Sequence, residues 1–169
     1  MAARGGFLSV HDGPEELRAA VRALRAAPRD LRNQINRAMR STMSGPWAQA
    51  VRESADTDGM AQRLIVKGAL IRPGNPPTLI AGNSTRRISK RGGGLTPSAD
   101  WHLAEYGADR TAKTTYKRLG YPVTRRTNTG WKQSYRRGRV LAPALAQIGP
   151  RLASLFVQTI VRGYMDILN

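Results

Sequence analysis

The apolar residues of this chain fall into two helix-spaced stripes, one near each end, and these stripes constrain the fold more than any other feature. The first stripe comprises Leu17, Val21, Leu24, Leu31, Ile35, Met39 and Trp47. The second comprises Leu152, Leu155, Phe156, Ile160, Tyr164, Ile167 and Leu168. Spacings of mostly three, four or seven residues place each set on one face of an α-helix. We therefore predict a helical segment over residues 14–54 and a C-terminal helix over residues 141–168.

Prolines interrupt both predicted helices. Pro28 lies within the first stripe, and Gly45-Pro46 and Gly149-Pro150 follow further along the chain. Proline has no N–H to donate and its ring clashes with the preceding turn of a helix. We therefore expect a joint, meaning a kink or a break between two consecutive helices, at each of these three positions.

Between the helices the sequence has short segments with strand character. Residues 61–71 contain β-branched side chains, and residues 78–82 follow a Pro- and Gly-rich connection, which predicts a hairpin-like pair of strands. Residues 100–107 predict a further strand. The whole order predicts a single domain over residues 1–169 of the α+β class. Its small, mostly antiparallel sheet, over residues 61–107, would pack against the helical segment and the C-terminal helix.

Positive charge is concentrated in one third of the chain. The formal net charge is +17, and residues 86–139 hold 14 basic side chains against 3 acidic ones. This stretch is rich in Gly, Thr and Ser and poor in aliphatic residues, so we expect loops there. We predict a basic loop over residues 83–98 and an extended basic arm over residues 108–139. A charge of this size requires a negatively charged partner, a neutralising neighbour or solvent.

No motif in the sequence indicates catalysis. His11 and His102 lack the spacing of metal ligands, and Asp56-Thr57-Asp58-Gly59 predicts a turn rather than a calcium loop. Gly92-Gly93-Gly94 lacks the Gly-Lys-Ser/Thr ending of a phosphate-binding loop. We therefore expect no enzyme activity, no cofactor and no metal site.

The absence of cysteine excludes a disulfide scaffold and the usual zinc fingers. No uninterrupted apolar run approaches the roughly 20 residues of a membrane-spanning helix, and the first residues lack the pattern of a signal peptide. We therefore expect a protein that does not associate with membranes.

Nucleic-acid binding without sequence specificity is one interpretation of the basic region. Basic residues alternate there with Trp101, Tyr116, Tyr121, Trp131 and Tyr135, which could combine phosphate neutralisation with base stacking. The motifs of zinc knuckles, RNA-recognition domains and similar modules are absent from the sequence.

The order of elements suggests a second interpretation. The segment Leu17-x-x-x-Val21-x-x-Leu24-x-x-x-Pro28-x-x-Leu31 precedes a helix rich in Arg and Ala, and Leu-Ala-Glu-Tyr-Gly (103–107) precedes the basic arm. The pattern Val-Leu-x-Pro-Ala-Leu (140–145) then enters the terminal helix. This arrangement resembles the tail-component family of long-tailed bacteriophages, the small proteins that complete the tail or join it to the head.

The resemblance implies a structural virion protein of the neck, assembled in the host cytoplasm. It implies a homo-oligomeric, sixfold ring that joins the head connector or stopper to the tail terminator or tail tube, with contacts to packaged DNA as an open question. Residues 83–98 and 108–139 would then be arms that reach neighbouring subunits or the lumen. The candidate contact residues are Arg86, Arg87, Lys90, Arg91, Arg110, Lys113, Lys117, Arg118, Arg125, Arg126, Trp131, Tyr135, Arg136 and Arg137.

Overall fold

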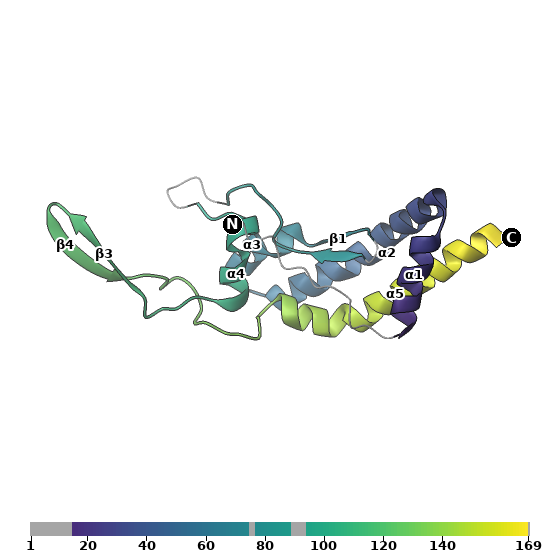
Figure 1. The fold of residues 1–169 in the computed structure, drawn as a ribbon. Helices are drawn as coiled ribbons and strands as arrows, with labels where there is room; N and C mark the ends of the chain where they lie inside the picture. The colour runs from purple at the N-terminus through teal and green to yellow at the C-terminus, as the bar shows by residue number, and fades with distance from the viewer. Residues whose placement is uncertain (1–14, 75–76, 89–93, 169) are drawn as a thin grey trace.

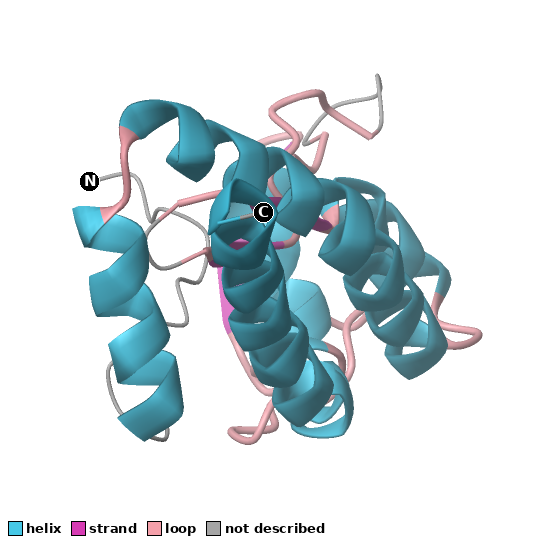
Figure 2. Cartoon of the chain, turned by 90° about the vertical axis from the view of Figure 1, so that its right-hand side faces the viewer, coloured by secondary structure: helices cyan, strands magenta, loops and turns pink. Residues whose placement is uncertain are grey.

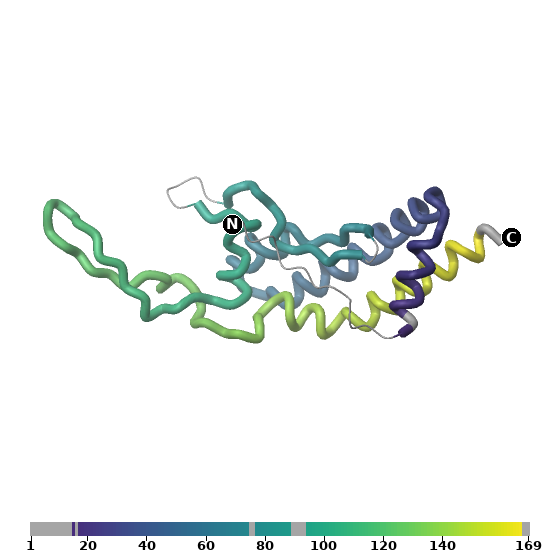
Figure 3. Tube along the Cα trace, viewed as in Figure 1, coloured from purple at the N-terminus to yellow at the C-terminus, as the bar shows by residue number. Residues whose placement is uncertain are grey.

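A computed structural model describes residues 15–74, 77–88 and 94–168 (Figure 1). Within them lie five α-helices and two separate two-stranded antiparallel sheets, which confirms the predicted α+β class. The molecule is elongated. Strands β3 and β4 lie at one end, and α1 and the end of α5 lie at the other (Figures 1 and 3).

Three helices build the body, and they account for most of the view in Figure 2. Helices α1 (Glu15–Ala26) and α2 (Arg29–Ala55) correspond to the predicted N-terminal segment, and α5 (Leu141–Leu168) to the predicted C-terminal helix. Helix α5 packs along α2 and also contacts α1. The stripe residues Leu24, Ile35, Met39, Trp47 and Phe156 are among the most deeply buried side chains. Burying each such side chain contributes roughly 1.5–3 kcal/mol.

The helix continues without a break at two of the three predicted joints. The chain does leave the helix between α1 and α2, at Ala27 and Pro28, but α2 continues through Pro46 and α5 continues through Pro150. A glycine precedes each of these internal prolines. Since the clash that excludes helix before proline involves the Cβ of the preceding residue, Gly45 and Gly149 relieve part of it.

Helix α5 is long and apolar enough, over Leu141–Asp166, to cross a membrane by length and composition. Its buried residues Ile148, Leu152, Phe156 and Ile160 belong to the same core cluster as those of α2. Only 28% of the most apolar window is buried within the described residues, so packing accounts for only part of this apolar content. The expectation of no membrane association stays a prediction.

The predicted strand over residues 61–71 is for the most part helical. Helix α3 (Gly59–Leu64) and a 3₁₀ turn (Val66–Gly68) precede the short strand β1 (Leu70–Arg72). The Asp58 carboxylate caps α3 by accepting hydrogen bonds from the backbone N–H groups of Met60 and Ala61. This cap, together with the burial of Ala61 and Leu64 at helical spacing, outweighs the β-branched content of the segment.

Strand β1 pairs with β2 (Thr78–Ile80), as the sequence predicts, with Leu70 opposite Ile80. The indole N–H of Trp47 donates to the carbonyl of Ile80 at 3.0 Å, which ties this ribbon to α2.

The predicted strand over residues 100–107 is also wrong, because Pro97–Tyr106 form helix α4. Pro97 occupies the first turn, where its missing N–H costs nothing, and the Asp100 carboxylate accepts from the N–H of Thr96. Gly107 ends the helix at φ 72°, a left-handed conformation that favours glycine.

Candidate functional site: the basic arm

The basic arm, residues 108–139, begins after α4 and ends at the start of α5. Its central part is a β-hairpin of β3 (Lys113–Arg118) and β4 (Tyr121–Arg126), paired from Lys113–Arg126 to Arg118–Tyr121. The prediction of an extended segment is therefore refined, since the arm contains a regular two-stranded ribbon. Apart from the half-buried Val123, every residue of the two strands is exposed.

A buried carboxylate closes the base of the arm. Glu105 is 0% exposed and accepts hydrogen bonds from the backbone N–H groups of Val140 at 3.0 Å, Leu141 at 2.8 Å and Ala142 at 3.3 Å. These donors belong to the first turn of α5, which has no intrahelical acceptors for them and carries the positive end of the helix dipole. Glu105, in the last turn of α4, therefore supplies the hydrogen-bond acceptors that the N-terminus of α5 lacks.

The two ends of the arm lie side by side. The N–H of Ala108 donates to the carbonyl of Lys132 at 3.0 Å, and the N–H of Tyr135 donates to the carbonyl of Tyr106 at 2.7 Å. A Cβ added at Gly107 would lie 2.5 Å from the Lys132 carbonyl oxygen, so only glycine allows this close approach. The arm therefore leaves and re-enters the body through one narrow base.

An ion pair joins this base to α3. The ammonium of Lys132 lies 2.8 Å from the carboxylate of Asp58. Partial burial raises the pKa of Asp58, but hydrogen bonds from Lys132, Ala61 and Met60 outweigh it, so its pKa lies below 3.8. Asp58 thus caps α3 and also binds Lys132 in the segment that returns from the hairpin to the body.

The hairpin turn is formed by Leu119 and Gly120, with φ of 51° and 84°. Positive φ at both central positions is the type I′ pattern, in which asparagine or aspartate usually precedes glycine. Leucine is unfavourable in this conformation, and here its side chain is 91% exposed. An apolar side chain therefore stands at the end of the arm with no partner in the described part of the molecule.

The two faces of the hairpin differ. Because side chains alternate along a strand, Lys113, Lys117 and Arg126 share one face with the hydrogen-bonded hydroxyls of Thr115 and Thr124. The opposite face carries Tyr116, Arg118, Tyr121, Val123 and Arg125. On that face the Arg125 guanidinium lies over the Tyr116 ring, 5.9 Å from its centroid.

The structure brings together only some of the predicted contact residues. Lys113, Lys117, Arg118, Arg125 and Arg126 gather on the hairpin, with Arg110 exposed at its entry.

The remaining ones lie apart from the hairpin. Arg86 and Arg87 are exposed in the loop between β2 and α4, while Lys90 and Arg91 lie outside the described residues. Trp131 is half-buried against the core at the base of the arm. Tyr135 lies beneath the Arg139 guanidinium at 4.9 Å, and Arg136 and Arg137 follow it, exposed.

Glu105 is the important residue that sequence reasoning did not identify. The sequence analysis places it in a predicted strand over residues 100–107 and in the motif Leu-Ala-Glu-Tyr-Gly, and neither indicates its contact with α5. The signal was available: an acidic side chain in an otherwise apolar and aromatic segment has to find donors if that segment packs into the core.

Of the two histidines, His11 lies outside the described residues. His102 is exposed on α4, with its ring against the edge of Trp101. No group of three or more His, Asp or Glu residues that could hold a metal ion occurs within the described ranges.

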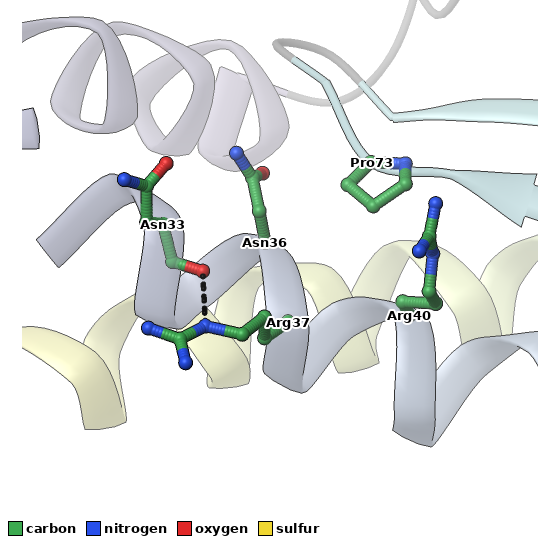
Figure 4. Close-up of a pocket in the computed structure, with 5 residues that line it drawn as sticks. All are labelled: Asn33, Asn36, Arg37, Arg40 and Pro73. Carbon is green, nitrogen blue, oxygen red and sulfur yellow. Dashed lines mark hydrogen bonds between the residues drawn. The ribbon is translucent and has the colours of Figure 1, made fainter. Parts of the chain in front are cut away.

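A surface hollow between α2 and the end of β1 is lined by Asn33, Asn36, Arg37, Arg40 and Pro73 (Figure 4). The Arg37 guanidinium there donates to the backbone carbonyl of Asn33. The hollow is basic and offers neither a nucleophile nor a general base.

Comparison with known protein families, curated proteins and solved structures finds no match to this chain.

Proposed function

We propose that this chain is a structural virion protein of a tailed bacteriophage, a ring-forming subunit of the neck that joins the head connector to the tail. The observation that carries the proposal is the arm. A well-formed hairpin, exposed along its length, stands away from a helical body that anchors it firmly at one base (Figure 1). An exposed hairpin of this kind gains little stability from contacts with its own chain, so it suits contacts with a neighbouring subunit or ring.

Apolar surface at the other end of the molecule supports assembly as well. A groove between α1 and α5 is lined by Ala20, Ala23, Val157, Val161, Tyr164 and Met165. Val161 is 52% and Met165 56% exposed. The exposed Leu119 and this groove lie at opposite ends, an arrangement that suits head-to-tail contacts between copies, which close into a ring when the rotation allows.

The test removes the hairpin without disturbing its base. The N–H of Thr127 donates to the carbonyl of Ala112 at 2.8 Å, so residues 113–126 can be replaced by an Asn-Gly turn between these two residues. We expect the shortened protein to fold with the same helix content and to fail to join heads to tails when it replaces the full chain in assembly. Normal yields of infectious particles would contradict the proposal.

Nucleic-acid binding without sequence specificity is the second candidate function, and the cations on both faces of the hairpin favour it. Sedimentation of the purified protein with and without DNA separates the two. A ring subunit associates on its own, whereas a nucleic-acid-binding monomer changes size only when DNA is added.

A further inference from the structure

Apart from Lys132, which pairs with Asp58, the cations of the arm form no ion pair within the described part of the chain. Residues 108–139 contain ten basic side chains and one acidic one, Asp109, whose carboxylate accepts hydrogen bonds from the N–H and the hydroxyl of Thr111. Within the described residues, no ion pair involves the hairpin cations. A second copy brings the same net charge of +17, so self-assembly concentrates this charge. The cations of the hairpin therefore require an anionic partner, in addition to any contact that its apolar tip makes with a neighbouring subunit.

The shape of the hairpin narrows the class of anion. Two paired strands of six residues form a ribbon about 20 Å long, with Lys113, Lys117 and Arg126 on one face and Arg118 and Arg125 on the other. A flat acidic protein surface meets only one face of such a ribbon. The major groove of duplex DNA is about 12 Å wide, admits a two-stranded ribbon and has phosphates along both of its walls.

Two of the aromatic residues considered for base stacking, Tyr116 and Trp131, are partly covered, whereas Tyr121 is 75% exposed. The Arg125 guanidinium lies over the ring of Tyr116, and stacking on a base requires a free ring face. Trp131 is half-buried against the core. The hydroxyls of Thr115 and Thr124 form a hydrogen bond with each other at 2.8 Å. This bond competes with hydrogen bonds from these hydroxyls to the edges of bases.

We propose that the β3–β4 hairpin binds duplex DNA in its major groove, through the phosphates and without sequence preference. This proposal deepens the second candidate function, nucleic-acid binding without sequence specificity, and does not depend on the assembly role. Binding is measured with DNA and the purified chain alone, whereas the neck function is measured by self-association and by the joining of heads to tails.

The test compares two triple variants of the full chain that lose the same charge. In the hairpin variant, Lys113→Gln, Lys117→Gln and Arg126→Gln remove one basic face. In the control, Arg22→Gln, Arg29→Gln and Arg40→Gln remove three exposed arginines of α1 and α2. Binding to a labelled random-sequence duplex is followed by fluorescence anisotropy at several salt concentrations.

We expect the hairpin variant to lose about tenfold or more in affinity, and its slope of log K against log salt to fall by about 0.9 for each lost phosphate contact. The control should keep both values nearly unchanged. An equal loss in the control would overturn the proposal, because binding would then follow net charge alone. Replacing both lysines by arginine should preserve binding, and a loss there would exclude simple phosphate contacts.

Two competitors test the class of partner. Single-stranded DNA of equal length and polyglutamate should each displace the labelled duplex less well than unlabelled duplex does. Equal competition by polyglutamate would assign the hairpin to acidic protein surfaces. Stronger competition by single strands, together with weaker binding of a Tyr116→Ala variant, would assign it to base stacking, and either result would overturn the duplex proposal.

Discussion

The carboxylate of Glu105 accepts a hydrogen bond from the backbone N–H of Leu141 at 2.8 Å, although 36 residues separate the two in sequence. The bond joins the last turn of α4 to the first turn of α5, and the whole basic arm lies in the chain between them. One buried side chain thus fixes both where the arm begins and where the longest helix of the body begins.

Loss of this carboxylate should strongly destabilise the protein. The Glu105→Ala change leaves three N–H groups of the first turn of α5 without their acceptor, and each unsatisfied buried group costs about 1–3 kcal/mol. Glu105→Gln keeps one acceptor oxygen but buries an amide NH₂ in place of the other, so we expect an intermediate loss. The free energy of unfolding in urea measures both effects. The Glu15→Gln variant, at an exposed position, is the control. A loss below about 1 kcal/mol for Glu105→Ala would contradict this account.

The close packing of α5 on α2 predicts a second effect. A Cβ at Gly163 would lie 2.7 Å from Cγ1 of Ile35, which is closer than carbon atoms approach in proteins. Replacing glycine by alanine inside a helix normally stabilises it by about 1 kcal/mol. At Gly163 we expect the opposite sign, a lower midpoint of thermal unfolding. In an Ile35→Ala background the obstacle is gone, so there the Gly163→Ala change should regain its stabilising sign. An equal cost in both backgrounds would show that the contact is not responsible.

Leu119 should contribute to assembly, although leucine is unfavourable in the conformation of the hairpin turn. Asparagine tolerates positive φ better than leucine, so Leu119→Asn should slow amide hydrogen exchange in β3 and β4 by favouring the turn. If the tip contacts a neighbouring subunit, the same variant should weaken self-association in sedimentation velocity. Leu70→Asn, at another exposed leucine, is the matched control. Unchanged association of the Leu119→Asn variant would remove the tip from the proposed interface.

Asp58 gives the stability a defined pH dependence. Its pKa in the folded protein lies below the ordinary 3.8, so its contribution is complete above that value and is lost as the pH falls through the folded pKa. We compare unfolding of the wild type with Asp58→Asn, which keeps an N-cap but removes the charge next to Lys132. The difference should be about 1 kcal/mol or less at neutral pH, since Lys132 is largely exposed, and should disappear in strong acid. A difference that grows as the pH falls would contradict the assignment.

The helices of the body were predictable because their signal is local. Residues such as Leu31, Ile35 and Phe156 repeat at helical spacing and are buried. The two predicted strands and the two predicted helix interruptions that were wrong depend on single backbone details. Asp58 caps a short helix, Pro97 begins another, and glycines before Pro46 and Pro150 let α2 and α5 continue.

The site was predictable in composition but not in geometry. Counting charges located the arm, yet the hairpin depends on Leu119 taking a conformation that leucine rarely adopts. The alternation of Tyr116, Val123 and Tyr121 with polar residues was the available signal for its strands. The role of Glu105 depends on a contact across 35 to 37 residues, which local sequence patterns do not contain.

Because its base at Ala108 and Lys132 is narrow, the arm can be replaced without changing the rest of the chain. Because the chain leaves and returns within one hydrogen bond, a ribbon of different length or charge can be grafted there while the helical body keeps its sequence. Substituting an acidic hairpin, for example, would change what the protein binds without changing the fold of its helical body.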